Sequence, residues 1–444
     1  MTGERYGLAV VGAGPAGVAA ALEAADAGVR VALVDAAPQP GGQFYRQPAP
    51  GLRARRPQAL HHAWRTWRRL RERLDAHIAA GRIAHLPGRQ VWSLEPGFTL
   101  HTLESGAIGA DAVVLATGGY EKVLPFPGWT LPGVVTAGGA QAMLKGGLVL
   151  PGRTVVVAGT GPLLLPVAAG LAAAGARVAA LAEAADPRAL LRQATAVPLG
   201  KAVEGAGYAA RLARHGVRVR WRHTVVAAHG TDRVEAVTLA GPGGVRRRVA
   251  CDALAVGHGL LPHTDLAGSF DVDVEQRTPT PGLWAAGEVT GVGGAELALA
   301  EGEIAGRSAA ARLRGTEPDP AAWAAAARRR ERLRRFAAVL DAVYRLPGDW
   351  AESAVTDDTL VCRCEEVPAS AVREAVRDLG AGDLRTVKLL TRAGMGWCQG
   401  RVCGPGVAAV AGCPFTDPGR PLARPVPLGL LAGAADEEEE REQP

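Results

Sequence analysis

The sequence predicts an α/β protein with two Rossmann-like, dinucleotide-binding domains and a small α-rich module near its C-terminal end. Two glycine-rich turns, at Gly12–Gly17 and Gly159–Gly161, each follow an apolar run typical of a buried strand and precede a helical pattern. Four of the six cysteines lie within residues 362–403 and mark the third module. At 444 residues the chain is long enough for two or three domains with well-buried cores.

The composition excludes several functional classes. The net charge of +6 comes mainly from arginine, and no RNA- or DNA-binding motif accompanies it, so we expect no nucleic-acid partner. The N-terminal residues run directly into a strand without the basic region of a signal peptide, and no apolar run reaches the roughly 20 residues that span a bilayer. We therefore expect a cytoplasmic protein without an integral membrane segment, where cysteines more often bind metals or transfer electrons than form structural disulfides.

The first glycine-rich turn has the full pattern of a dinucleotide site. Residues 7–35 predict a strand, the turn Gly12-x-Gly14-x-x-Gly17, a helix, and a second strand that ends in Asp35. In this arrangement Gly14 lets a pyrophosphate approach the helix N-terminus, and the acid accepts hydrogen bonds from a ribose 2′-hydroxyl. The unit is therefore predicted to bind a dinucleotide.

The second glycine-rich turn is less complete. Residues 153–183 predict another βαβ unit, with Gly159 and Gly161 in its turn and Glu183 at the end of its second strand. Leu164, however, stands at the third glycine position. The unit is interpreted either as a site for NAD(P) or another nucleotide, or as a duplicated fold whose pocket is degenerate.

Three further segments add elements to these units. Residues 111–119 and 281–294 predict buried strands that end in glycine-rich turns, and a helix follows from residue 295. The N-terminus of that helix would carry a partial positive charge. Residues 60–78 predict an amphipathic helix rich in arginine. A solvated face explains these arginines, and an anionic partner or peripheral membrane association is the alternative.

Together these segments resemble the glutathione- and thioredoxin-reductase-like flavoproteins, which have two dinucleotide-binding domains. The resemblance covers residues 5–315. It implies a discontinuous FAD domain, residues 1–125 and 250–315, with a second nucleotide-binding-type domain, residues 126–249, inserted between the two parts. Thioredoxin reductases carry a Cys-x-x-Cys disulfide beside the flavin, but the single cysteine before residue 362 is Cys251, expected to be a buried structural thiol. We therefore do not expect disulfide reduction.

The resemblance also implies which residues bind the cofactors. Glu288 stands where the family often has Asp, so the carboxylate that would meet the ribityl hydroxyls of FAD lies on a longer side chain than in those relatives. The residues expected at FAD are Gly12, Gly14, Pro15, Ala16, Gly17, Asp35, Gly42, Gln43, Val91, Thr117, Gly118, Gly287 and Glu288. The candidates for a nucleotide in the second domain are Gly159, Gly161 and Glu183.

The cysteines form the pairs Cys362-x-Cys364 and Cys398-x4-Cys403. Four thiolates can hold a [2Fe–2S] cluster or a structural zinc ion. Paired zinc ligands usually lie two to four residues apart, and the spacing of these two cysteine pairs fits that pattern less well. Free or redox-active thiols are a third interpretation. The pattern resembles the bacterioferritin-associated-ferredoxin-type [2Fe–2S] domain, in which all four cysteines are ligands. Cys413 is not expected to be one.

The cysteine module is flanked by two other segments. A helical linker, residues 316–355, connects it to the flavoprotein part, and the [2Fe–2S]-binding domain itself covers residues 356–415. Residues 416–444 form a tail. Its acidic end, Asp436–Glu440, is expected to be disordered because like charges repel one another.

Across nearly the whole chain, these motifs, together with Gly41–Arg46 and Leu124–Gly133, resemble the α or B-type subunit of heteromeric amino-acid dehydrogenases. That family includes hydrogen cyanide synthase, opine oxidase and D-hydroxyproline dehydrogenase, with the sarcosine oxidase α subunit more distant. The resemblance implies an FAD- and [2Fe–2S]-dependent electron-transfer subunit. It also implies a flavin-containing β subunit that oxidises an amino or imino acid, often a small ferredoxin-like γ subunit, and an electron acceptor.

Two other functions fit the sequence. A stand-alone NAD(P)H:acceptor oxidoreductase would bind nicotinamide on the second βαβ unit and release electrons through the cluster. A zinc-stabilised flavin-binding scaffold would not be an enzyme. No residue is assigned as catalytic, because His258 and His263 occur singly and a lone histidine is more often structural.

Overall fold

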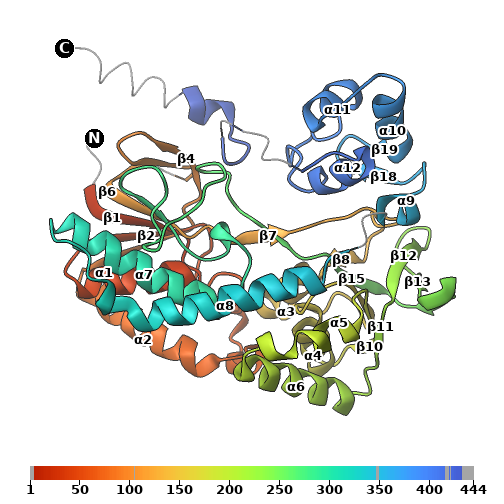
Figure 1. The fold of residues 1–444 in the computed structure, drawn as a ribbon, viewed down its shortest axis with the longest axis horizontal. Coiled ribbons are helices and arrows are strands. Elements are labelled where there is room, and N and C mark those ends of the chain that lie inside the picture. The colour runs from red at the N-terminus through yellow and green to blue at the C-terminus, as the bar shows by residue number, and fades with distance from the viewer. Residues whose placement is uncertain (1–4, 105, 347–349, 416–419, 421, 433–444) are drawn as a thin grey trace.

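Two β-sheets, one mixed and one parallel, organise the chain, and a small C-terminal domain packs beside them (Figure 1). The structure is a computed structural model that describes residues 5–104, 106–346, 350–415, 420 and 422–432. The predicted acidic end of the tail lies outside these residues. None of the described helices is both long and apolar enough to cross a membrane.

The first sheet has seven strands in the order β3-β2-β1-β6-β5-β4, with β17 also paired to β6. The pairs among β1, β2, β3, β6 and β17 are parallel, whereas β4 and β5 are antiparallel. The strands are β1 (Arg5–Val11), β2 (Val31–Asp35), β3 (Ile83–Pro87), β4 (Val91–Glu95), β5 (Thr99–Thr102), β6 (Ala107–Leu115) and β17 (Leu283–Ala285). β1 and β2 are nearly continuous apolar runs, as expected where a parallel sheet is covered on both faces.

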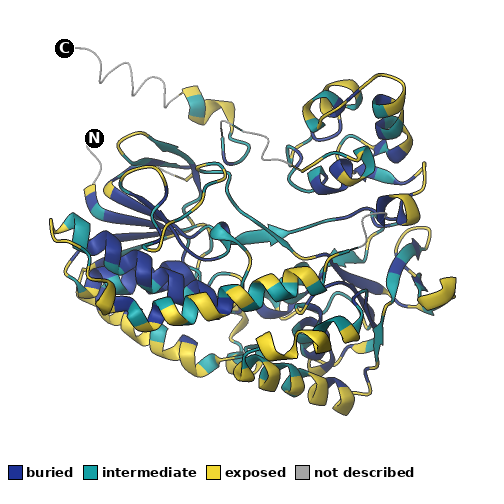
Figure 2. Ribbon diagram, in the orientation of Figure 1, coloured by how far each residue is buried: buried dark blue, intermediate teal, exposed yellow. Residues whose placement is uncertain are grey.

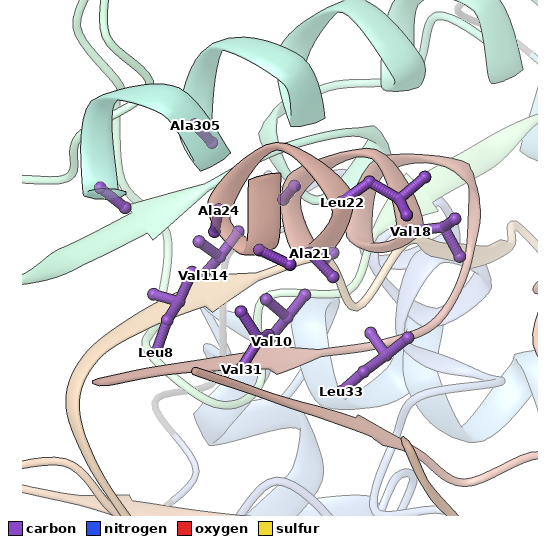
Figure 3. Close-up of a cluster of buried hydrophobic side chains, with 14 of the residues drawn as sticks. Leu8, Val10, Val18, Ala21, Leu22, Ala24, Val31, Leu33, Val114 and Ala305 are labelled. Atoms are coloured by element: carbon purple, nitrogen blue, oxygen red, sulfur yellow. The ribbon is translucent and has the colours of Figure 1, made fainter. Parts of the chain in front are cut away.

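Helix α1 (Pro15–Asp26) lies between this sheet and helix α7 (Ala295–Leu313) (Figure 3). Its alanines and Leu22 meet Leu8 and Val10 of β1 in one buried cluster. A Cβ on Gly302 or Gly306 would overlap the backbone of α1, so these glycines allow the two helices to approach closely. The predicted amphipathic helix is α2 (Trp64–Ala79), which has a largely exposed outer face (Figure 2), and its arginines are exposed except for the half-buried Arg71.

The second sheet contains five parallel strands in the order β11-β10-β9-β15-β8. They are β8 (Val134–Thr136), β9 (Thr154–Gly159), β10 (Arg177–Glu183), β11 (Val219–Trp221) and β15 (Ala253–Gly257). Its helices are α3 (Ala137–Gly147), α4 (Leu164–Ala173), α5 (Pro187–Arg192) and α6 (Leu199–Arg214). An antiparallel sheet adjoins it, formed by β12 (Thr224–His229), β13 (Ala236–Ala240) and β14 (Arg246–Ala250).

One predicted boundary needs correction. We expected the chain to return to the first domain at residue 250, but β15 pairs with β9 and β8 and completes the second sheet. The return occurs instead at the two-stranded connection of β7 (Gly119–Glu121) and β16 (Leu260–Pro262). The apolar run of β15 fits either sheet, so local sequence did not decide between them.

The C-terminal part begins with helix α8 (Ala324–Val343), which packs on α7 and extends toward the second sheet (Figure 1). The small domain follows, with α9 (Trp350–Ala354), β18 (Leu360–Cys362), β19 (Val367–Pro368), α10 (Ala369–Arg377), α11 (Leu384–Thr391) and α12 (Gly404–Ala411). It is attached to the connection between the sheets, because Trp129 Nε1 donates to the carbonyl oxygen of Leu360 at 2.6 Å. The chain then returns to the first domain, where the Ala423 amide donates to the carbonyl of Trp92 at 3.0 Å.

Candidate flavin and iron–sulfur sites

The carboxyl ends of four parallel strands in the first sheet meet at one edge. Val11 of β1 is in register with Val34 of β2 and Leu115 of β6, and Leu115 is in register with Ala285 of β17. The residues that follow these strands therefore lie together. They include the predicted Gly12, Asp35, Thr117, Gly118, Gly287 and Glu288, at the edge where open α/β sheets bind ligands.

The glycine-rich turn and the start of α1 form the centre of this edge. A Cβ on Gly17 would overlap the carbonyl oxygen of Gly12, so only glycine permits this packing. Pro15 occupies the first turn of α1, where its missing N–H costs no helical hydrogen bond. Ala16 beside it packs against Gly287. The N-terminus of α1 thus presents backbone amides to an anionic ligand such as a pyrophosphate.

Asp35 is held by the turn that it faces. Its carboxylate accepts hydrogen bonds from the backbone amides of Ala13 and, at 2.6 Å, of Ala37. Burial raises the pKa of Asp35, although both amides oppose this shift. The carboxylate is fixed in orientation, and its remaining lone pairs can accept a ribose hydroxyl.

A second glycine-rich loop packs against the first. The Gly41 amide donates to the carbonyl of Ala13 at 2.7 Å. Gly42 has a φ of +58°, and a Cβ there would lie 2.8 Å from the Cα of Gly14. Gln43, next in the loop, accepts hydrogen bonds from Arg46 at 3.1 and 2.7 Å. The structure therefore brings predicted residues from two distant loops to the same edge.

The other predicted FAD residues differ in their environment. Thr117 donates from Oγ1 to the carbonyl of His263 at 2.7 Å. Burial raises the pKa of Glu288, whose side chain lies near Gly119. Val91 is buried in an apolar cluster with Val11 and Val34.

Glu301 of α7 is a residue that the sequence analysis missed. It has no exposed surface. Its Oε2 accepts hydrogen bonds from the Gly287 amide at 2.9 Å and from Thr290 Oγ1 at 3.1 Å. Arg334 of α8 donates from Nε to Oε1 at 2.8 Å. This buried carboxylate fixes the turn after β17. The one feature of the sequence that could have indicated its role is a charged residue on an otherwise apolar face of the helix.

In the second sheet, Glu183 occupies the same topological position as Asp35. It accepts hydrogen bonds from the amides of Gly161 at 3.1 Å and Ala185 at 2.9 Å. Burial raises the pKa of Glu183 to about 7. The equivalent Gly159 turn is partly covered by the end of α8, since Thr160 Oγ1 donates to the carbonyl of Tyr344 at 2.9 Å.

A narrow cavity of about 10 Å³ remains beside the second turn, about enough space for one water molecule. Ligand sites for drug-sized molecules measure roughly 300–1,000 Å³. The cavity is lined by Gly161, Leu164, Leu165, Leu181, Glu183, Val219, Trp221 and Tyr344. A dinucleotide would therefore require Tyr344 to move.

The four predicted cysteine ligands lie together in the C-terminal domain. The Cys398 side chain interacts with those of Cys403 and Cys364, and the Cys403 side chain interacts with that of Cys362. All six cysteines of the chain are free thiols, and Cys251 is buried as expected. Within the part of the chain that the structure describes, no group of three or more His, Cys, Asp or Glu side chains has the arrangement of a metal site, although each of these four cysteines interacts with at least one of the others.

The surroundings of these sulfurs fit a cluster of thiolate ligands. The hydrogen bond from Cys403, together with the amides of Val402 and Gly400, lowers the pKa of Cys398 to about 4, whereas the same interaction and burial raise the pKa of Cys403. Donors to sulfur stabilise the thiolate form that binds metal. A Cβ on Gly396 would overlap the side chain of Cys364, so this glycine lets the two loops close around the sulfurs.

Two protein families match the chain. Residues 6–312 match the pyridine nucleotide-disulphide oxidoreductase family, and residues 360–411 match the BFD-like [2Fe-2S] binding domain. The first match implies FAD and the second a [2Fe–2S] cluster, and residues 360–411 include all four paired cysteines. The predicted α/β fold with its C-terminal cluster domain is confirmed.

Known proteins resemble the chain over most of its length. The opine oxidase A subunit of Agrobacterium tumefaciens is 33% identical, over 90% of this chain and 84% of that protein. The HcnB subunit of hydrogen cyanide synthase from Pseudomonas protegens is also 33% identical, over 89% of each. The crystal structure of L-proline dehydrogenase from P. horikoshii has the same fold, with a TM-score of 0.64 at 21% identity, and the match covers 96% of this chain and 79% of that one.

The sheet edge, the cysteine cluster and these matches lead to one assignment. The chain belongs to the pyridine nucleotide-disulphide oxidoreductase family and, within it, to the group that contains the opine oxidase A subunit and the HcnB subunit of hydrogen cyanide synthase.

Proposed function

We propose that this chain is the electron-transfer subunit of a heteromeric dehydrogenase that oxidises an amino or imino acid of the proline, hydroxyproline, glycine or opine type. The observation that carries the proposal is the presence of two redox sites in one chain. The first sheet has the geometry of an FAD site, and the four cysteines lie together in a separate domain attached to it.

The chemistry of the two centres suits a relay. A flavin exchanges two electrons with a substrate or another flavin, whereas a [2Fe–2S] cluster carries one at a time. Disulfide reductases of this fold pass electrons to a nearby cysteine pair, but the six cysteines here are free and none of them belongs to the FAD domain's predicted site. The cluster domain supplies the alternative exit or entry for electrons.

A partner chain would perform the oxidation of the amine. The related opine oxidase and hydrogen cyanide synthase chains are both named as subunits of their enzymes. We propose a β subunit with its own flavin as the amine-oxidising partner, with a small ferredoxin-like γ subunit and an electron acceptor completing the system.

The closed second pocket argues against direct reduction by NAD(P)H. Tyr344 and Trp221 line the cavity beside the Gly159–Gly161 turn, and the space is smaller than a dinucleotide requires. The carboxylate of Glu183 is already engaged by two backbone amides. A stand-alone NAD(P)H:acceptor oxidoreductase is therefore the less favoured function.

Anaerobic reduction of the purified, FAD- and cluster-loaded chain tests the proposal. The flavin absorbance would be followed after mixing with L-proline, 4-hydroxyproline, glycine or octopine, and separately with NADH and NADPH. We expect no rapid bleaching in any mixture. Coexpression with a flavin-containing amine oxidase encoded beside it should yield a complex whose flavin bleaches with one of the amino or imino acids. Rapid bleaching by NADH or NADPH, or efficient oxidation of a substrate by the chain alone, would contradict the proposal.

A further inference from the structure

Asp265 lies between the FAD domain and the cluster domain, just after β16. Its side chain is only 9% exposed, and three side chains surround the carboxylate. Arg401 donates from Nε to Oδ2 at 2.9 Å, and Arg420 donates from Nη1 to Oδ1 at 2.7 Å. His263 Nε2 lies 3.2 Å from Oδ2. Although burial alone would raise the pKa of Asp265, the hydrogen bonds from His263 and Arg401 lower it to about 2.

On one side, this group is fixed to a loop of the FAD site. The backbone amide and carbonyl of His263 both form hydrogen bonds with this loop. Its amide donates to the carbonyl of Gly118 at 2.9 Å, and its carbonyl accepts from Thr117 Oγ1 at 2.7 Å. Thr117 and Gly118 follow β6 at the ligand-binding edge of the first sheet. Residues 263–265 therefore move with the loop that is expected to contact FAD.

On the other side, the same carboxylate holds the loop between two cysteine ligands. Arg401 lies between Cys398 and Cys403, and its Nη1 donates to the carbonyl of Cys398 at 3.4 Å and to Gln399 Oε1 at 3.2 Å. Arg420 donates from Nε to the carbonyl of Gln399 at 3.0 Å. Both arginine side chains are mostly covered, at 16% and 13% exposure.

The charges of Asp265 and the two arginines fix the geometry of this contact. One carboxylate pairs with two guanidinium groups in a largely desolvated position, where hydrogen bonds between charged groups are strong and their geometry is fixed. Replacing the acid would leave two neighbouring cations without a counter-charge, which is costly in a covered site. Asp265 is thus suited to fix one loop relative to the other.

We propose that Asp265 is a positioning residue that fixes the Cys398–Cys403 loop against the Thr117–Gly118 loop and thereby sets the rate of electron transfer between the flavin and the cluster. This inference rests on the proposed function, since it requires both centres on one chain. The step itself is a one-electron transfer in which one centre is oxidised and the other reduced, and no bond forms or breaks. The rate of such a step falls steeply with the separation of donor and acceptor, so a shift of this loop would slow it.

The test measures the internal transfer without a substrate or partner. The loaded chain would be reduced by flash photolysis with 5-deazaflavin and EDTA, and the absorbance changes of flavin and cluster would be followed separately. Asp265→Asn is expected to slow the transfer about tenfold or more. Arg401→Lys keeps the positive charge but loses the several N–H donors of the guanidinium, so it is expected to slow the transfer less. Asp111→Asn, in the exposed pair with Arg5, is the control and should leave the rate unchanged.

Two further readouts separate positioning from simple loss of structure. FAD and iron contents of Asp265→Asn should equal those of the wild type. Hydrogen exchange of residues 398–403 should become faster, also in protein without the cluster. An unchanged transfer rate in both variants would overturn the inference, as would a decrease that only matches a loss of iron. Because no amino acid is present, failure of a partner to reduce the chain would refute the proposed function while leaving this result intact.

Discussion

Arg334 of α8 donates a hydrogen bond to Glu301 of α7 at 2.8 Å, although Glu301 is completely buried. The second oxygen of Glu301 holds the Gly287 amide and the Thr290 hydroxyl. Burial raises the pKa of Glu301, and the charge of Arg334 opposes this effect. The linker helix thus stabilises the turn after β17, where FAD is expected to bind.

Arg334→Met should therefore destabilise the FAD domain. Removing the cation leaves the buried carboxylate uncompensated, which costs up to about 3–5 kcal/mol in a fully buried pair and less here because Arg334 is 33% exposed. We expect a lower unfolding temperature and a lower FAD content after purification, measured by thermal denaturation and by flavin absorbance. Arg345→Met, which removes an exposed pair with Asp341, is the control and should cost less than about 1 kcal/mol. Equal effects of the two substitutions would contradict this role of Glu301.

Gly42→Ala should release FAD by moving one loop against another. An alanine at a positive φ costs about 1 kcal/mol wherever it occurs. At Gly42 the new Cβ would also lie 2.8 Å from the Cα of Gly14 in the glycine-rich turn. Gly81→Ala is a matched control, because Gly81 has a φ of +69° but no atom close to its Cβ position. Without FAD, Gly42→Ala should lose more stability than Gly81→Ala because of this overlap, and only Gly42→Ala should bind FAD more weakly in a fluorescence titration.

Cys398→Ser should remove the cluster and keep the flavin. Cys398 contacts two other ligand sulfurs, so its loss leaves three thiolates where four are required. We expect iron and acid-labile sulfide to fall to near zero while FAD content remains that of the wild type. Cys413→Ser, outside the ligand set, should retain both. A wild-type protein that contains zinc but no iron would contradict the cluster assignment.

Local sequence could predict the site residues that lie close together in the chain, within one strand–turn–helix unit. Gly12, Gly14, Gly17 and Asp35 belong to a single βαβ unit of about 30 residues, so spacing alone placed them together. The cysteine pairs were likewise recognisable from their spacing.

The residues that sequence could not predict act across long separations. Glu301 meets Arg334 only because α8 packs on α7, and Asp265 meets Arg401 only because the cluster domain folds back on the FAD domain. No periodicity or motif joins such pairs. The predicted domain boundary at residue 250 was wrong for a related reason: the apolar residues of β15, which pairs with β8 and β9 in the second sheet, would suit the core of either sheet.

The pKa of Glu183 predicts how the stability of the second domain depends on pH. Burial raises it from 4.5 to about 7 in the folded state. Between these values the folded protein binds more protons than the unfolded chain, so stability must fall as pH rises from about 4.5 to about 7. The difference corresponds to about 3 kcal/mol at most. Above pH 7 the carboxylate is ionised in both states and this contribution no longer changes.

Glu183→Gln should remove that part of the pH dependence, because the amide does not titrate. Unfolding in urea at pH 5 and pH 7.5 would give the change in unfolding free energy for each protein. The wild type is expected to lose up to about 3 kcal/mol more than the variant over this interval. Glu235→Gln, an exposed carboxylate of the same domain, should behave as the wild type does. If Glu183→Gln showed the same pH dependence as the wild type, Glu183 would have to be ionised in the folded protein throughout this range.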